Sequence, residues 1–235
     1  MKTKIKAVIL AGGKGTRLKP YSTVIPKPIV PVGDKAILEI LIGRLKKFGI
    51  TDLTICVNHL AELIMAYFGN GGKLGVNIEY SIEDIPLGTV APIKLIKKLP
   101  ENFIVMNGDL LTDLNFKEFY DNHLENKALM TIATYKRVSK IDFGVIDIDE
   151  SNNVVKGFKE KPEYKLDVSM GVYIMNRKVL ENIPLNKKFG FDDLVLRMLK
   201  KGQRIKVYPY KGYWLDIGRP DDYEKANKDI GKINL

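Results

Sequence analysis

A glycine-rich segment near the N-terminus has the composition of a phosphate-binding loop. The segment consists of Leu10, Ala11, Gly12, Gly13, Lys14, Gly15, Thr16, Arg17 and Leu18. Successive backbone N–H groups in such a segment can form an anion-binding concavity, because glycines carry no side chains that would keep a phosphate away. The guanidinium of Arg17 can hold two phosphate oxygens in a bidentate arrangement. By itself, the segment is equally compatible with a tight turn after a strand.

The spacing of the glycines argues against two widespread nucleotide-binding motifs. A Walker A loop requires the pattern Gly-x-x-x-x-Gly-Lys-Ser/Thr, which this segment does not contain. A dinucleotide fingerprint requires a third glycine where Leu18 stands, and an acidic residue about 20 positions further on, and neither is suitably placed. A dinucleotide-dependent oxidoreductase is therefore disfavoured.

Two charged residues further along the chain could act together with the glycine segment. Lys27 lies between Pro26 and Pro28, so its ammonium group is carried by a stiffened backbone. Asp109 comes shortly after the apolar run 103–106, which is predicted to be a buried strand. In open α/β sheets, ligands bind at the carboxyl ends of the strands. We therefore expect Asp109 to lie at that edge of the sheet, where it would face a ligand.

The predicted secondary structure alternates between strands and helices in the first half of the chain. Strands are expected at 4–10, 53–57, 76–80 and 103–106, and helices at 36–48, 60–68 and 89–95, the last of them capped by Thr89. From about residue 128, strands are expected at 129–135, 144–148, 154–158 and 168–175, followed by a helix at 191–200 and a last helix near Pro220. The pattern predicts a single α/β domain with a Rossmann-like, doubly wound, mostly parallel mixed sheet flanked by helices. Residues 1–127 and 128–235 would be its two halves, without a linker between them.

The composition excludes several classes of protein. Hydrophobic residues make up 45% and charged residues 28% of the chain, which are globular values that rule out wholesale disorder. The longest uncharged apolar stretch, 7–13, is too short to cross a bilayer, which requires about 20 residues. The net charge of +10 favours anionic partners, but no basic run is interleaved with aromatic residues as in nucleic-acid binding. Cys56 cannot form an internal disulfide, because it is the single cysteine. We therefore expect a cytoplasmic protein that binds phosphorylated small molecules rather than nucleic acid or a membrane.

Taken in order along the chain, the motifs resemble those of the sugar-1-phosphate nucleotidylyltransferases, and most closely the short, mannose-1-phosphate guanylyltransferase-like members. The matching motifs are Gly-Gly-x-Gly-Thr-Arg-Leu at 12–18, Pro-Lys-Pro at 26–28, Asn-Gly-Asp at 107–109, Glu-Lys-Pro at 160–162 and Trp-Leu-Asp-Ile-Gly at 214–218. The resemblance implies transfer of a nucleotidyl group from a nucleoside triphosphate to a sugar 1-phosphate, with release of pyrophosphate. Because the attacking phosphate is already an anion, no general base is required. His59 and His123 are accordingly expected to be structural or exposed.

The resemblance also implies roles for individual residues. The nucleotide-binding residues would be Leu10, Ala11, Gly12, Gly13, Gly15, Thr16, Glu83, Gly88 and Thr89. The catalytic cations would be Arg17, Lys27 and Lys161, and the sugar-phosphate-binding residues would be Asn107, Gly144, Glu160 and Lys161. Asp109 and Asp216 would hold Mg²⁺, the implied cofactor, since this ion is typically bound by one or two carboxylates together with substrate phosphates. Asp113, Asp221 and Asp222 are expected to be turn or capping residues.

The identity of the base depends on Glu83. Thymidylyl- and uridylyltransferases of the family commonly present a Gln at this place, which matches the donor and acceptor edge of a pyrimidine. An ionised carboxylate only accepts hydrogen bonds, so Glu83 can meet the adjacent N1–H and N2–H₂ donors of guanine with both oxygens. A pyrimidine carbonyl facing it would cost on the order of 1–3 kcal/mol. GTP is therefore favoured, unless Glu83 points to solvent and a main-chain group reads the base.

Several alternatives remain open from the sequence. Mannose 1-phosphate is the favoured acceptor, and the alternatives are uridylyl, thymidylyl or cytidylyl transfer to glucose 1-phosphate, to a heptose 1-phosphate or to a phosphorylated non-sugar. A catalytically silent nucleotide-sugar sensor would be a different class, but the complete set of charged motif residues argues for an enzyme. The chain ends soon after Tyr223, without the additional C-terminal domain of longer relatives. We therefore expect a minimal catalytic unit that acts as a monomer or a homodimer.

Overall fold

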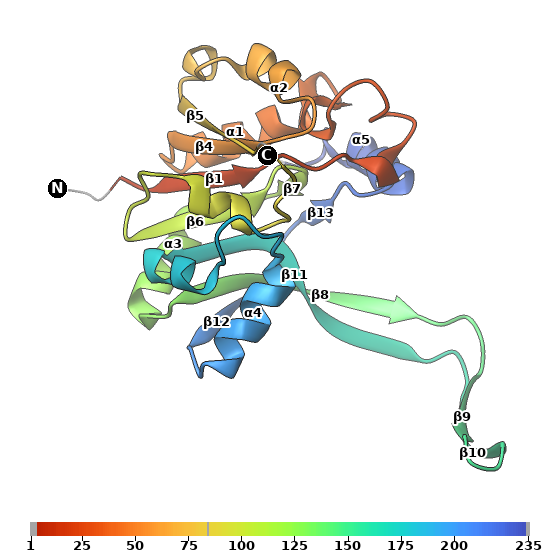
Figure 1. The fold of residues 1–235 in the computed structure, drawn as a ribbon. Helices are drawn as coiled ribbons and strands as arrows, with labels where there is room; N and C mark the ends of the chain where they lie inside the picture. Colours follow the sequence, from red (N-terminus) through yellow and green to blue (C-terminus); the bar gives the residue numbers. More distant parts are fainter. Residues whose placement is uncertain (1–3, 84, 234–235) are drawn as a thin grey trace.

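The computed structural model describes residues 4–83 and 85–233, and its core is a seven-stranded sheet (Figure 1). In spatial order the strands are β12 (Ile205–Tyr210), β8 (Met130–Lys140), β11 (Glu163–Asn176), β6 (Asn102–Asn107), β1 (Lys6–Leu10), β4 (Asp52–Val57) and β5 (Asn77–Ile82). In the described part of the chain, β11 alone runs antiparallel to its neighbours in this sheet. The predicted mostly parallel mixed sheet is thus confirmed. Because β6 from the first half pairs with β11 from the second, one sheet spans both predicted halves.

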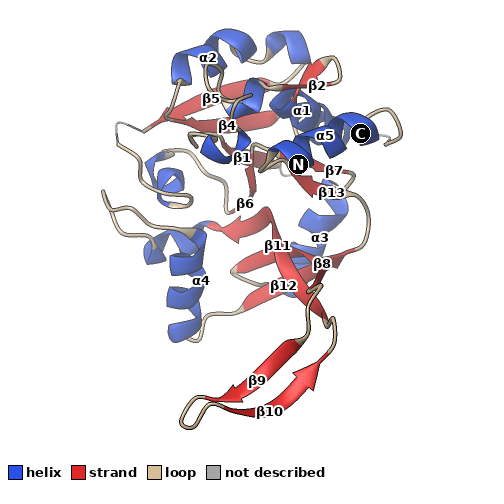
Figure 2. Ribbon diagram, turned by 90° about the vertical axis from the view of Figure 1, so that its right-hand side faces the viewer, coloured by secondary structure: helices blue, strands red, loops and turns tan. Residues whose placement is uncertain are grey.

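Helices cover both faces of this sheet, as the alternation of strands and helices predicts (Figure 2). One face packs against α1 (Ile37–Lys47), α2 (Ala61–Phe68) and α3 (Phe116–Asn126), and the other against α4 (Phe191–Lys200) and the 3₁₀ helices η4 (Ala91–Leu95) and η5 (Arg177–Asn182). Successive residues of a strand point to opposite faces, and β1 illustrates the two layers. Ile9 lies in the same buried cluster as Leu41 of α1, whereas Val8 clusters with Leu194 of α4.

Shorter elements surround the carboxyl end of β1 and bring distant parts of the chain together. They are η1 (Thr16–Leu18), η2 (Lys27–Ile29), β2 (Pro31–Val32), β3 (Lys35–Ala36), β7 (Leu110–Thr112), β13 (Trp214–Asp216) and α5 (Pro220–Asp229), whereas η3 (Gly72–Leu74) lies at the amino edge of the sheet, just before β5. Strands β7 and β13 pair antiparallel with each other. Leu18, Leu111, Ile217 and Ala226 belong to one buried cluster, which packs the glycine segment, this two-stranded ribbon and α5 against one another.

Strands β8 and β11 continue past the sheet and carry a hairpin. The hairpin consists of β9 (Val145–Asp149) and β10 (Val154–Lys159), and in both ribbon views it stands away from the rest of the molecule (Figures 1 and 2). We call residues 141–162 the arm, and the paired segments 134–140 and 163–169 that carry it the stem. Most side chains of the arm are exposed to solvent.

Some elements differ from the predicted ones. The predicted helix 89–95 is the short 3₁₀ helix η4, and Thr89 does not cap it. Instead, Oγ1 of Thr89 accepts a hydrogen bond of 3.1 Å from the N–H of Phe191 at the start of α4. Helix α3 and strand β12 were not predicted, and α3 is hard to recognise because most of its residues are polar. The strands expected at 129–135 and 168–175 are longer than predicted, since both extend into the stem.

Two buried side chains have the structural roles that the sequence suggests. The Nδ1 of His123 lies 2.7 Å from Oγ1 of Thr131, and its Nε2 lies 3.2 Å from Oδ1 of Asn102. Burial lowers the pKa of His123 to about 4, so the ring is neutral at physiological pH. Burial likewise raises the pKa of the Cys56 thiol to about 12. Across residues 4–83 and 85–233, no helix combines the length and the apolar composition that crossing a bilayer requires.

Candidate active site

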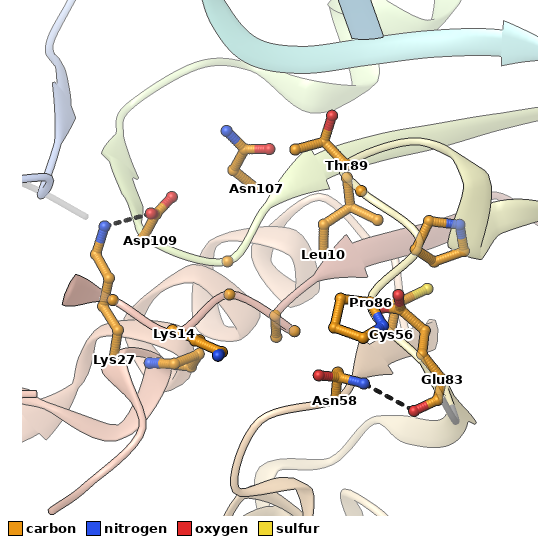
Figure 3. Close-up of a pocket in the computed structure, with 18 of the residues that line it drawn as sticks. Leu10, Lys14, Lys27, Cys56, Asn58, Glu83, Pro86, Thr89, Asn107 and Asp109 are labelled. Atoms are coloured by element: carbon orange, nitrogen blue, oxygen red, sulfur yellow. Dashed lines mark hydrogen bonds and ion pairs between the residues drawn. The ribbon is translucent and has the colours of Figure 1, made fainter. Parts of the chain in front are cut away.

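A cleft of about 510 Å³ opens where β1 and β6 end (Figure 3). It is lined by Leu10, Ala11, Gly12, Gly13, Lys14, Gly15, Thr16, Arg17, Lys27, Pro28, Cys56, Asn58, Glu83, Pro86, Gly88, Thr89, Pro92, Asn107, Gly108, Asp109, Lys188 and Gly218. All the predicted nucleotide-binding residues are in this set, and so are Arg17, Lys27, Asn107 and Asp109. The carboxyl edge of the sheet therefore holds the cleft, as expected for an open α/β sheet.

The glycine segment forms one wall of the cleft, and two of its glycines leave no room for a side chain. At Gly15, where φ is +63°, a Cβ atom would lie 3.1 Å from the Cβ of Lys27. At Gly12, a Cβ would lie 3.0 Å from Oε1 of Glu83. At Gly13, by contrast, a Cβ would meet no described atom within 4 Å, so this backbone faces open space. A phosphate can approach such a backbone closely.

Lys27 and Asp109 form a partly buried ion pair at one end of the cleft (Figure 3). The Nζ of Lys27 donates a hydrogen bond to Oδ2 of Asp109, and the lysine side chain is 9% exposed. Lys27 begins η2, between Pro26 and Pro28, so the two prolines hold its backbone as the sequence suggests. The ammonium group is therefore fixed at the rim of the cleft and is not free to sample solvent.

Asp216 lies beside Asp109, although 107 residues separate them in the sequence. The β7–β13 ladder places Asp216 opposite Leu110, and the N–H of Ile217 donates to the carbonyl oxygen of Asp109 at 3.1 Å. Burial, and secondly the negative charge of Asp109, raise the pKa of Asp216, while Lys27 and Arg17 act in the opposite direction. The two carboxylates that the resemblance groups together thus do meet in space.

The two aspartates have the properties of a site for a divalent cation. Oδ1 of Asp109 and Oδ1 of Asp216 are buried, and neither has a hydrogen-bond partner among the described residues. Leaving a buried polar atom unsatisfied is costly, by about 1–3 kcal/mol or more for a charged group. Within the described ranges, no cluster of three or more His, Cys, Asp or Glu side chains could hold a metal ion. The arrangement fits a hard ion such as Mg²⁺, which takes one or two carboxylates and completes its shell with water and substrate phosphates.

Glu83 closes the opposite end of the cleft and is buried, with an exposure of 7%. Its Oε2 accepts a hydrogen bond of 3.0 Å from the N–H of Leu87, and its carbonyl oxygen accepts one of 2.8 Å from Nδ2 of Asn58 (Figure 3). Burial raises the pKa of Glu83, and the Leu87 N–H partly opposes this effect. The alternative in which Glu83 points to solvent is therefore wrong. Oε1 lies beside Gly12, and Oε2 keeps a second lone pair besides the one that the Leu87 N–H engages, so the contact of both oxygens with guanine stays a prediction.

The sugar side differs most from the prediction. Gly144, Glu160 and Lys161 were expected to line the cleft together with Asn107. Asn107 does line the cleft, but the other three residues lie on the arm, exposed to solvent and outside the set of lining residues. The reason is the stem, in which β8 and β11 remain paired far beyond the edge of the sheet. Motif order along the chain carries no information about the length of that ladder.

Lys188 is a cleft residue that the sequence analysis missed. It lies in the loop before α4, and this loop is fastened to the cleft by backbone hydrogen bonds. Phe189 N–H donates to the Leu87 carbonyl at 2.8 Å, and Val90 N–H donates to the Phe189 carbonyl at 3.2 Å. At Gly88, where φ is +91°, a Cβ would lie 2.8 Å from the Phe189 oxygen, so the two loops are in close contact. No local sequence pattern around Lys188 indicates that this loop lies at the cleft, because its position depends on packing against residues far away in the sequence.

Two of the three aspartates set aside as structural, Asp113 and Asp222, hydrogen-bond to the backbone. Oδ1 of Asp113 accepts from the N–H of Tyr213 at 2.6 Å and from the hydroxyl of Tyr210. Oδ2 of Asp222 accepts from the N–H of Arg219 at 2.9 Å, at the start of α5. Neither is among the residues that line the cleft.

Comparison with known proteins gives three findings. A family model described as "Nucleotidyl transferase" matches residues 6–233. One relative is the D-glycero-alpha-D-manno-heptose 1-phosphate guanylyltransferase of Aneurinibacillus thermoaerophilus, which is 35% identical over 96% of this chain and 98% of its own length. Another is the mannose-1-phosphate guanyltransferase of Candida albicans, which is 33% identical over 93% of this chain and 62% of its own length. The crystal structure of HddC from Yersinia pseudotuberculosis complexed with GMP-PN superposes with a TM-score of 0.73, at 31% identity, over 96% of this chain and 99% of that one.

Proposed function

Because the chain belongs to the nucleotidyl transferase family, and within it to the sugar-1-phosphate nucleotidyltransferases, we propose that it is a Mg²⁺-dependent guanylyltransferase with mannose 1-phosphate as its first candidate acceptor. The products would be a GDP-sugar and pyrophosphate. The observation that carries the proposal is the meeting of Asp216, which is not itself a lining residue, with Asp109 and Lys27, which line the cleft; two carboxylate oxygens of this group are buried and unpartnered among the described residues.

In the proposed reaction, a phosphate oxygen of the sugar 1-phosphate attacks the α-phosphorus of GTP. A new P–O bond forms, the bond between the α-phosphorus and the bridging oxygen breaks, and pyrophosphate leaves with that oxygen. The attacking oxygen is already an anion, so no proton has to be removed from it. Neither His59 nor His123 lines the cleft, which agrees with a reaction that needs no general base.

The chain's own residues would align and neutralise the reacting phosphates. The backbone of the glycine segment would receive the triphosphate, while Arg17 and Lys27 would balance its charge. Asp109 and Asp216 would hold Mg²⁺, which when bound supplies further positive charge at the triphosphate. Lys27 would then be shared between Asp109 and the substrate. Catalysis of this kind depends on alignment and preorganised charge rather than on proton transfer.

Support for GTP comes from the environment of Glu83. Its Oε1 is the oxygen not engaged by the Leu87 N–H, and it can accept a hydrogen bond from N1–H or N2–H₂ of guanine. A uracil or thymine carbonyl at the same place would face an acceptor, at a cost of about 1–3 kcal/mol. Two relatives named as guanylyltransferases and a structural neighbour complexed with GMP-PN are in keeping with this choice.

The acceptor is proposed to have the manno configuration, which the names of both relatives share. Mannose 1-phosphate is the first candidate. A manno-heptose 1-phosphate is the second, because the heptose-specific relative is covered over nearly its whole length. We place the enzyme in the cytoplasm and in nucleotide-sugar biosynthesis, as a monomer or homodimer without a nucleic-acid or membrane partner.

A substrate panel tests the proposal. Pyrophosphate release would be measured with Mg²⁺ for GTP, UTP, dTTP and CTP, each combined with mannose, manno-heptose or glucose 1-phosphate. We expect the fastest turnover with GTP and a manno-configured acceptor, and loss of turnover when EDTA replaces Mg²⁺. Faster turnover with UTP or dTTP would refute the base assignment. No pyrophosphate release with any pair would favour a silent sensor of nucleotide sugars.

A further inference from the structure

The sugar side of the cleft is open in a single copy of the chain. Among the lining residues, only Lys188 and Gly218 come from the half of the chain after residue 128. The motif Glu160-Lys161-Pro162, which would supply the contacts to the sugar and its phosphate, lies on the arm instead. The site is therefore incomplete without an arm.

The stem holds the arm away from its own cleft. Gly171 marks the level of the cleft, because a Cβ there would lie 2.6 Å from Nδ2 of Asn107. From the pair Ser169–Thr134 outward, the ladder continues without a break to the pair Glu163–Lys140. These six steps along the strand, at about 3.3 Å each, amount to about 20 Å. Lys161 lies beyond the end of this ladder, so it can reach its own cleft only if the paired strands bend sharply back.

One side of the hairpin is an exposed apolar surface, which we call the apolar arm face. Ile146 pairs with Phe158 and Ile148 pairs with Val155 across the two strands, so all four side chains lie on the same side. Their exposed fractions are 50%, 62%, 50% and 60%, respectively. A two-stranded hairpin is marginally stable at best in water, and clustered exposed apolar side chains mark an interaction site. This face therefore requires a partner surface.

Charge favours another copy of the chain as that partner. Residues 141–162 contain three lysines and five acidic residues, which gives a net charge of −2. The chain as a whole carries +10, so the remainder carries +12. Cations Lys14, Arg17 and Lys188 line the cleft itself. The acidic arm is thus attracted to the basic remainder of a second copy of the chain.

From these observations we infer that two copies of this chain exchange arms, so that the arm of each copy completes the sugar-phosphate side of the other copy's cleft. An arm carried on the extended stem can enter a neighbouring molecule without breaking the β8–β11 ladder. A two-fold axis would let both arms do so at once, in an isologous dimer. The inference rests on the proposed function for the role of Lys161, but not for the association of the two chains.

Complementation between two inactive variants tests the exchange. Asp109→Asn has a damaged cleft and an intact arm, whereas Lys161→Ala has an intact cleft and a damaged arm. If the variants are refolded together, half of the dimers are mixed, and one of the two sites in each mixed dimer has an intact cleft and an intact arm. We expect the mixture to recover about a quarter of the wild-type activity. Activity that stays at the mean of the two separate variants, or full activity of Lys161→Ala alone, would overturn the exchange.

A second measurement does not depend on activity. In sedimentation equilibrium we expect the wild-type chain to be a dimer and Val155→Glu, on the apolar arm face, to be a monomer. Val154→Glu is the matched control: Val154 is 55% exposed, close to the 60% of Val155, but adjoins Val155 on the strand and points to the other side. A monomeric wild-type chain would overturn the inference. A dimer that Val155→Glu dissociates, with no pyrophosphate release from any substrate pair, would instead refute the proposed function and leave the arm contact standing.

Discussion

The rim of the cleft and the arm both carry motifs that resemble those of the family, but the rim residues are held by packed structure and the arm residues are exposed. At the rim, Lys27 is buried against Asp109, and Asp216 is held by the β7–β13 ribbon. On the arm, Glu160 and Lys161 are exposed and are carried by two strands without a core. Groups for phosphate and metal chemistry are thus preorganised within one chain, whereas groups for sugar recognition lie on an element that a second surface must position.

The largest effect is expected at the rim, because its carboxylates would hold the metal ion. Asp109→Asn and Asp216→Asn keep the side-chain volume but each remove one negative charge. We expect each to lower kcat by roughly a hundredfold or more, since preorganised charge of this kind is worth that much in other enzymes. Burial and Asp109 raise the pKa of Asp216, so ionisation of this side chain costs more free energy in the folded chain than in the unfolded chain. Asp216→Asn should therefore leave the melting temperature unchanged or raise it.

Asp221→Asn is the control for these variants, because Asp221 is exposed in the first turn of α5. It should retain wild-type activity and lose no more than about 1 kcal/mol of stability, the contribution of an acidic side chain in the first turn of a helix. Near-normal turnover of either rim variant at saturating Mg²⁺ would remove that residue from the metal site. A large drop in melting temperature together with the loss of activity would point to a structural role for the pair.

The rim was predictable from sequence, whereas for the arm only the two strands of the hairpin were predictable and its position was not, for a physical reason. The Gly12–Arg17 segment, Lys27 and Asp109 follow strand ends or proline-stiffened turns, and local residue types largely determine such features. The meeting of Asp216 with Asp109 followed from the resemblance alone, since the β7–β13 ribbon was not predicted. The position of Lys161 depends on how far β8 and β11 stay paired, which short sequence motifs do not specify.

At the base end of the rim, Glu83→Gln should change nucleotide preference. A glutamine can still accept the hydrogen bond from the Leu87 N–H, but it presents an NH₂ donor where Oε1 now lies. We expect the ratio of kcat/KM for GTP over UTP to fall about ten- to a hundredfold. Glu79→Gln, on the strand β5 that precedes Glu83, is the control, because its side chain is 54% exposed and paired with Lys6. An unchanged ratio would show that a main-chain group reads the base.

Lys188 offers a smaller test, since it belongs to the cleft but is itself exposed. Lys188→Met keeps most of the side-chain stem and removes the charge. We expect KM for the anionic substrates to rise about tenfold at low salt, with a smaller change in kcat, and the difference to shrink as salt screens the charge. Lys187→Met is the control, because the neighbouring lysine is exposed and does not line the cleft. Equal effects of the two variants would assign Lys188 to the general basic surface.

The smallest expected effect concerns the body, by which we mean the chain outside the arm. It tests whether the body unfolds independently of the arm. His123 on α3 bonds to Asn102 of β6 and Thr131 of β8, so it joins the two predicted halves. Burial lowers its pKa from the ordinary 6.5 to about 4. Between these values the unfolded chain binds a proton that the folded chain does not, so acidification favours unfolding. Lowering the pH from about 7.5 to about 5.5 should then reduce the free energy of unfolding by about 1 kcal/mol through this residue.

Urea unfolding, followed by the fluorescence of Trp214, measures this pH dependence of the free energy of unfolding. His123→Gln should lose this part of the pH dependence, and His59→Gln should keep it. The arm variant Val155→Glu should also keep it, provided that the body unfolds as one unit independently of the arm. Loss of the pH dependence in Val155→Glu would mean that arm and body fold cooperatively. The arm would then differ from the body only in the solvent exposure of its side chains.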